Sequence, residues 1–222
     1  MKRFVMILSI ILFSGIVLSS QIVSVKAGLF FPFCDSDLWE VNFENLALSK
    51  SDMVNSVYSI EYEHFINKKI SFVFEASNYS KTFYTAYRDY EYDDGSPINQ
   101  NLYLKTMGFE INLRFYPAMA NKKLNPYFGV GGGFIYWDYE QWGEFINFEQ
   151  GYVYEGYADT KTFSPIFNAR VGLLYRITYN IGLIFEAKYS FSKGELSSLF
   201  EGFEKFDLSG LIFNLGFSIF LD

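Results

Sequence analysis

The sequence predicts an all-β protein, an eight-stranded antiparallel up-and-down transmembrane β-barrel, and three observations predict it. Apolar residues alternate with small or polar ones along much of the chain, and strand side chains point to opposite faces at this period of two. Aromatic residues make up 21% of the chain, with 26 Phe and 18 Tyr, which suits a lipid-facing band. The segments that join the alternating stretches are short and long in turn, as in membrane barrels.

Eight segments carry the alternation, and each is long enough to cross a bilayer as a tilted strand of about 9–11 residues. In chain order they are 21–31, 53–66, 70–82, 102–116, 126–137, 164–176, 181–191 and 208–221. Their apolar faces include, in the same order, Val25, Ile60, Phe72, Phe109, Phe128, Val171, Phe185 and Phe213. The opposite faces include Lys26, Glu61, Glu75, Glu110, Gly129, Arg170, Glu186 and Asn214.

The connections assign the two sides of the membrane. Turns of a few residues follow the second, fourth and sixth segments, at 67–69, 117–125 and 178–180. Longer stretches follow the first, third, fifth and seventh, at 32–52, 83–101, 138–163 and 192–207. Short turns face the periplasm and long loops face outward in bacterial barrels, so both chain ends are expected in the periplasm. The first loop is expected to hold a helical turn within 37–48.

The apolar face must point outward. A soluble barrel of eight strands would bury that face in its lumen, which is only just wide enough to be filled by side chains. So many Phe and Tyr rings do not fit there, whereas Gly, Ser and Asn do. Exceptions on the expected inner face are Val73, Leu174, Ile184 and Ile212.

Residues 1–20 are predicted to be a cleaved signal peptide, which leaves 21–222 as one barrel domain. Lys2 and Arg3 precede an apolar run over 4–18, which is shorter than the about 20 residues of a membrane-spanning helix. Cleavage after Ala27 would remove the first strand and leave an odd number, so it is rejected. Cys34 is the only cysteine, which excludes an intrachain disulfide.

Charged residues on the inner face are candidates for an ion-pair network in the lumen, because isolated charges are costly in a narrow bore. Five are basic and five acidic: Lys26, Arg114, Arg170, Arg176, Lys188, Glu61, Glu63, Glu75, Glu110 and Glu186. Two interpretations stay open, a purely structural polar core and a switchable gate for small solutes. We expect no constitutive pore in either case.

The outer loops are expected to be acidic and rich in aromatic residues. They hold most of the 25 Asp and Glu residues, and the net charge of −7 argues against nucleic acid as a partner. Acidic loops could share divalent cations with lipopolysaccharide, although their spacing matches no calcium-binding motif. Trp39, Trp137, Trp142 and Tyr139 are expected at the membrane interface or on a contact surface.

The sequence contains little that indicates a catalytic site or a cofactor site. His64 is the only histidine, it precedes a periplasmic turn, and no Ser/His/acid pattern surrounds it. The glycine run at 131–133 is not followed by a helix, so it does not form a phosphate loop. The sequence therefore predicts a protein that is not an enzyme and has no metal or cofactor site.

Four stretches together resemble the small eight-stranded outer-membrane barrels of the OmpA-transmembrane, OmpX and OmpW type. They are 26–32 (KAGLFFP), 125–133 (NPYFGVGGG), 169–176 (ARVGLLYR) and 180–189 (NIGLIFEAKY). The resemblance covers residue 21 to the end. Such chains usually end on an aromatic residue, which resembles the recognition signal of the barrel-assembly machinery, whereas here Leu221 and Asp222 follow Phe220.

The resemblance implies a bacterial outer-membrane location, with outer-membrane lipid, lipopolysaccharide and the barrel-assembly machinery as partners. The functions of the group are diverse. A passive envelope role with surface contacts through the loops, to host or other surface ligands, agrees best with the sequence. A narrow channel for small or hydrophobic solutes is the alternative, and a lipid-modifying enzyme is the least favoured.

Overall fold

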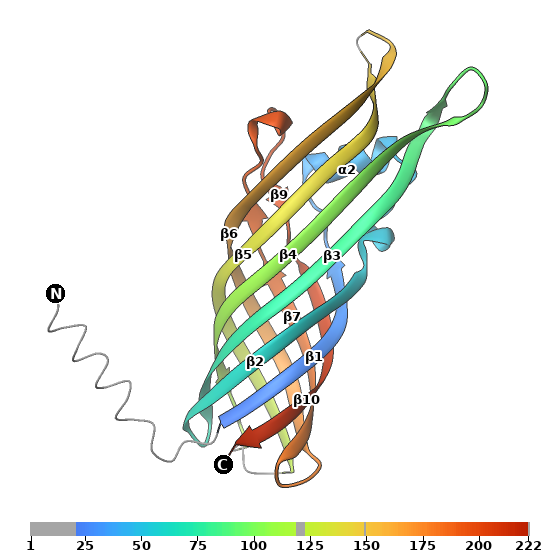
Figure 1. The fold of residues 1–222 in the computed structure, drawn as a ribbon. Helices are drawn as coiled ribbons and strands as arrows, with labels where there is room; N and C mark the ends of the chain where they lie inside the picture. Colours follow the sequence, from blue (N-terminus) through green and yellow to red (C-terminus); the bar gives the residue numbers. More distant parts are fainter. Residues whose placement is uncertain (1–20, 119–122, 149, 222) are drawn as a thin grey trace, which may run out of the picture.

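In the computed structural model, which describes residues 21–118, 123–148 and 150–221, eight antiparallel strands close into one barrel (Figure 1). The strands are β1 (Gln21–Pro32), β2 (Asn55–Asn67), β3 (Ile70–Glu91), β4 (Pro97–Phe115), β5 (Leu124–Asn147), β6 (Tyr152–Arg176), β7 (Ile181–Phe191) and β10 (Gly210–Leu221). Each pairs with the next barrel strand of the chain, and β1 closes the ring against β10. The predicted fold class is confirmed.

The side chains face as the alternation predicts. Along β10, Phe213 and Phe217 are exposed on the outer wall, whereas Asn214 is buried in the bore. On β1, Val25 is 60% exposed while its neighbour Lys26 is 1% exposed. A continuous apolar wall of this kind is unstable in water and therefore indicates a lipid surrounding. A closed barrel is suited to lipid, because all its backbone groups are hydrogen-bonded between its own strands.

Two hairpins are much longer than the sequence predicts. Strands β3, β4, β5 and β6 have 22, 19, 24 and 25 residues, against 11 in β7. A membrane-spanning strand needs about 9–11 residues, so roughly half of each extends beyond the bilayer. The prediction of long loops at 83–101 and 138–163 is therefore wrong for most of those residues. Figure 1 shows both hairpins rising above the rest of the barrel.

The first and last long connections fold across the outer end of the barrel. Helix α2 (Asp37–Asn45) lies within the predicted range 37–48, and the short helix η1 (Lys50–Met53) follows it. The last connection holds the two-stranded sheet of β8 (Lys193–Gly194) and β9 (Phe206–Asp207), and the short helix η2 (Ser198–Phe200). Leu46, just after α2, forms a bridge to Tyr87 of β3, which fastens the helix to the long hairpin.

The interior has apolar clusters at both ends of the barrel, and the charged residues lie between them. The outer cluster contains Trp39, Trp137 and Phe206, and the periplasmic cluster contains Tyr116 and Phe220. The inward apolar exceptions are buried as expected: Val73, Leu174, Ile184 and Ile212. Both ends of the bore are thus filled by side chains.

The helices of the described residues are all too short or too polar to cross a membrane. The predicted signal peptide, residues 1–20, lies outside the described residues.

Candidate functional site

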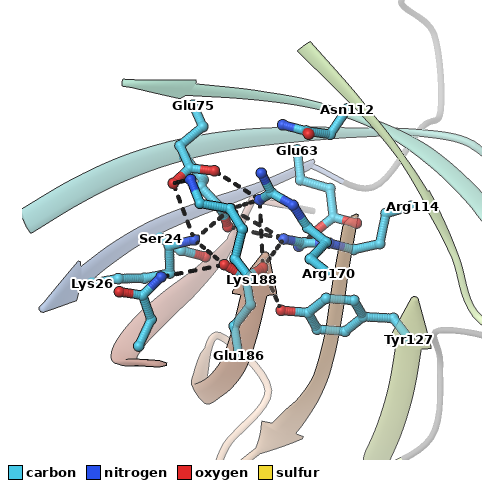
Figure 2. Close-up of polar contacts among 12 residues, drawn as sticks. Ser24, Lys26, Glu63, Glu75, Asn112, Arg114, Tyr127, Arg170, Glu186 and Lys188 are labelled. Atoms are coloured by element: carbon cyan, nitrogen blue, oxygen red, sulfur yellow. Dashed lines mark hydrogen bonds and ion pairs between the residues drawn. The ribbon is translucent and has the colours of Figure 1, made fainter. Parts of the chain in front are cut away.

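Nine of the ten charged residues predicted for the lumen converge at one level of the bore, and Figure 2 shows most of them. They project from six of the eight barrel strands, because each occupies an inward position of the alternation. All nine are at most 5% exposed: Lys26, Glu61, Glu63, Glu75, Glu110, Arg114, Arg170, Glu186 and Lys188. We call these nine residues the polar layer.

One half of the polar layer is organised around Lys26 and Arg114. The Lys26 ammonium lies 2.6 Å from Glu61 Oε1 and 2.7 Å from Glu186 Oε1. Arg114 lies 2.7 Å from Glu63 Oε2, 3.1 Å from Glu61 Oε2 and 3.2 Å from Glu186 Oε2. Each of these two cations therefore bridges carboxylates from different strands, which ties opposite sides of the wall together.

The other half is organised around Arg170 and Lys188. Arg170 Nη1 lies 2.7 Å from Glu75 Oε2 and 2.9 Å from Glu61 Oε1. Lys188 Nζ lies 3.0 Å from Glu110 Oε1 and 3.1 Å from Glu75 Oε1. Glu61 and Glu75 are shared between the cations, so the layer is one connected network.

Four cations face five carboxylates, and uncharged donors supply further hydrogen bonds. Tyr116 and Ser71 donate to Glu63, and Tyr127 donates to Glu186 at 2.9 Å. The Arg114 guanidinium also lies 4.1 Å from the centre of the Tyr127 ring. Buried charges are tolerated when their lone pairs and protons find partners in this way.

Arg176 lies apart from the polar layer, although the sequence grouped it with the other nine. It occupies the periplasmic end of β6, where the interior is apolar, and its guanidinium stacks 3.9 Å from the centre of the Phe220 ring. No ion pair joins it to a carboxylate within residues 21–118, 123–148 and 150–221. The alternation correctly predicts that Arg176 points inward, but it does not give the position of the residue along the barrel axis.

Carboxylate oxygens of Glu61, Glu75 and Glu186 lie within 4.8 Å of one another, a spacing that a metal ion could use. The ammonium of Lys26 already contacts all three carboxylates, at 2.6 to 3.6 Å. A divalent cation would have to displace that ammonium. The donor set is therefore better described as ion-paired than as a metal centre.

Above the polar layer, four aromatic rings pack in the mouth of the bore. The ring of Phe206, from β9, lies 4.7 Å from Trp39, 4.7 Å from Tyr139 and 5.4 Å from Trp137. The Trp137 indole donates to Ser164 and the Trp39 indole to the carbonyl oxygen of Asp207. We call these four rings the aromatic plug.

The aromatic plug corrects one expectation from the sequence. Trp39, Trp137 and Tyr139 were expected at the membrane interface or on a contact surface, but all three are fully buried. The signal was available for two of them, because Trp137 and Tyr139 continue the inward positions of β5. Nothing in the sequence pairs Trp39 or Phe206 with them.

His64 faces outward at the periplasmic end of β2, opposite Phe72 of β3. The long hairpins and the acidic loops lie at the other end of the barrel. The only imidazole is therefore far from any chemistry at the outer surface.

The outer hairpins carry an acidic cluster around Lys161. Its ammonium lies 2.6 Å from Glu140 and 3.4 Å from Asp138. The hydrogen bond to Glu140 is the main cause that raises the pKa of Lys161, while desolvation raises the pKa of Asp138. The β5–β6 hairpin thus pairs its one ammonium in this cluster with acidic neighbours from both of its strands.

Together, the lipid-facing wall, the polar layer and the aromatic plug define an eight-stranded transmembrane barrel with a filled bore. No protein-family model matches the chain, and no curated protein matches its sequence. Solved structures do match. The outer membrane protein OprG from Pseudomonas aeruginosa is 11% identical, with 91% of this chain and 96% of that one covered and a TM-score of 0.55.

A major outer membrane protein from Thermus thermophilus is similar at 10% identity, with 92% of this chain and 100% of that chain covered and a TM-score of 0.50. At such identities the likeness shows the fold and nothing finer. The chain therefore has the fold of the small outer-membrane barrels, which is the group that its sequence resembles.

Proposed function

We propose that the protein is an integral outer-membrane protein whose closed barrel holds a structured outer surface for contact with other molecules. The observation that carries this proposal is the filled bore: a charged layer bridges the wall from several sides, with apolar clusters above and below it. A barrel built for steady flow would need a continuous wet path instead.

The outer hairpins support the contact role. They are paired strands along most of their length, so their side chains are held in place before any partner arrives. Tyr84 is 83% exposed, and Phe148, Tyr152 and Tyr157 are exposed as well. Aromatic residues of this kind are enriched where proteins meet partners.

The partners of this proposal are outer-membrane lipid and lipopolysaccharide around the wall, the barrel-assembly machinery during insertion, and surface or host ligands at the hairpins. Strand β10 ends in an outward Leu221 with Phe220 turned inward, so Phe217 is the outward aromatic residue closest to the end that the machinery could read. The acidic surface argues against nucleic acid.

Ion conductance in planar lipid bilayers tests the closed bore. The wild-type protein should give no steady conductance. Combining Arg170→Ala with Phe206→Ala removes contacts at two levels of the bore and should produce openings, whereas Tyr84→Ala on the outer hairpin should not.

Steady conductance from the wild-type protein would overturn the closed-bore proposal. It would favour the second candidate, a narrow channel for small or hydrophobic solutes in which the polar layer acts as a gate.

A further inference from the structure

A cavity of about 380 Å³ opens among the outer segments of the molecule. All four outer connections contribute to its lining: Asn42 from α2, Gln100 from the β3–β4 hairpin, Gln141 from the β5–β6 hairpin and Phe200 from η2. The volume is within the range of ligand pockets, which begins at about 300 Å³. Because four separate segments form this cavity, it depends on how they pack together and is not a surface irregularity of one loop.

The lining of the cavity has no charge. Its side chains are aliphatic, aromatic or carboxamide, and none is Asp, Glu, Lys, Arg or His. The surrounding segments are strongly acidic, so this is a local departure from the composition of the outer surface. A charged ligand would find no partner inside, and an anion would be repelled by the rim.

Buried carboxamides form one polar part of the lining. The Asn42 amide donates to the Tyr139 hydroxyl at 2.8 Å, and the Gln141 amide donates to Asn42 Oδ1 at 2.9 Å. These bonds fix the orientation of both side chains. They leave the Gln141 carbonyl oxygen free to accept a hydrogen bond from a molecule in the cavity.

Gln100 is the second and independent observation. It is only 4% exposed, it lines the cavity, and its carboxamide makes no hydrogen bond within the residues that the structure describes. Its nitrogen and oxygen nevertheless keep some access to the cavity, because they are not among the fully buried atoms without a partner. A ligand hydroxyl in the cavity can therefore reach this carboxamide and supply the hydrogen bond that the protein itself does not.

Aromatic rings form much of the remaining wall, among them Phe145, Phe148, Tyr154, Tyr157 and Phe203. Flat rings beside carboxamides match a molecule that has an apolar face and a hydrogen-bonding edge. A pyranose sugar has both, since its C–H groups gather on one face and its hydroxyls on the rim. A purely apolar ligand would cover the rings but leave the carboxamides without a hydrogen-bond partner.

We propose that the cavity binds an uncharged sugar, a neutral mono- or disaccharide unit held by Gln100 and Gln141 against the aromatic wall. The inference deepens the proposed contact function, on which it rests, by naming the ligand class. The sugar could belong to a glycan of another cell or to the bacterium's own lipopolysaccharide, and the two sources share this chemistry.

Equilibrium binding to the purified full-length protein tests the proposal. An amine-oxide detergent is required, because alkyl glycoside detergents carry the proposed ligand. The probes are lactose and N,N′-diacetylchitobiose as neutral sugars, glucuronate as the charged sugar and naphthalene as the apolar solute. Delipidated core oligosaccharide is the second arm, and it distinguishes the lipopolysaccharide source from a foreign glycan.

At least one neutral probe should bind saturably and at least tenfold more tightly than glucuronate. Gln100→Leu should weaken that binding about tenfold, which corresponds to the loss of about 1.4 kcal/mol, or one neutral hydrogen bond. Gln150→Leu, an exposed glutamine at the tip of the same outer surface, is the matched control and should bind like the wild type. Phe203→Ala removes a half-buried ring of the wall and provides a second variant if Gln100→Leu fails to fold.

Three results would overturn the sugar proposal: no saturable binding of any neutral sugar, wild-type affinity in both Gln100→Leu and Phe203→Ala, or binding of naphthalene that neutral sugars do not displace. None of these affects the closed bore. Conductance tests that part separately, so failure of the sugar site and failure of the proposed function are distinguishable.

Discussion

Replacing Arg170 by Met measures how much more a buried ion pair contributes to the free energy of unfolding than an exposed one. Arg170 Nη1 lies 2.7 Å from Glu75 and 2.9 Å from Glu61, and the side chain is fully buried. Methionine keeps an unbranched side chain but removes one of the four cations that face the five buried carboxylates, so Glu61 and Glu75 each lose a partner. Breaking a buried pair in this way costs about 3–5 kcal/mol. Lys161→Met is the matched control, because its ammonium lies as close to Glu140, at 2.6 Å, but is 38% exposed.

The assay is urea unfolding of the protein in lipid vesicles, followed by tryptophan fluorescence. With a slope of about 2 kcal/mol per molar urea, Arg170→Met should lower the midpoint by roughly 1.5–2.5 M. Lys161→Met should lower it by less than about 0.5 M, since exposed pairs contribute about 0–1 kcal/mol. Adding Glu75→Gln to Arg170→Met should restore part of the loss. Coinciding midpoints for the two single variants would refute the reasoning.

Two further predictions concern the wall and the first loop. Leu215→Arg, midway along the outer face of β10, should cost about 2–4 kcal/mol in the same unfolding assay, whereas Tyr84→Arg on the outer hairpin should cost almost nothing. Equal tolerance would contradict the assigned facing. Hydrogen bonds from Ser49 lower the pKa of Asp52, so this carboxylate adds stability above its unfolded pKa that is lost as the pH falls through the folded pKa. Ser49→Ala should raise the pKa of Asp52 in an NMR titration, and an unchanged value would contradict the assignment.

The part of the fold inside the membrane could be predicted because lipid imposes a strict rule on it. Each crossing strand must show an apolar side to the bilayer, so residues such as Phe213 and Asn214 reveal both the strand and its facing. Outside the bilayer that rule ends. The outer half of the β5–β6 hairpin pairs Glu140 with Asp159 on its outward face, so the outward apolar signal of a membrane strand is missing there and the sequence predicts a loop.

The candidate site divides in the same way. The inward positions of the alternation predict that Lys26 and Glu61 lie in the bore, and the same rule applies to Trp137. The alternation gives the direction of a side chain but not its partner. The pairing of Arg170 with Glu75 and the separation of Arg176 from the polar layer therefore needed the three-dimensional structure. The cavity could not be predicted from the sequence, because Asn42, Gln100 and Gln141 come from segments whose mutual position depends on how the loops fold.

Unequal strand length explains why the outer connections fold at all. Strands β1, β2, β7 and β10 end near the bilayer, whereas β3 to β6 continue outward as a four-stranded sheet that no longer closes on itself (Figure 1). The inward face of that sheet stays apolar, with Leu102, Leu104 and Tyr139 buried on it. It needs a cover, since an open apolar face in water is unstable. Helix α2 and Phe206 supply that cover, and the binding cavity is the space that the cover leaves open.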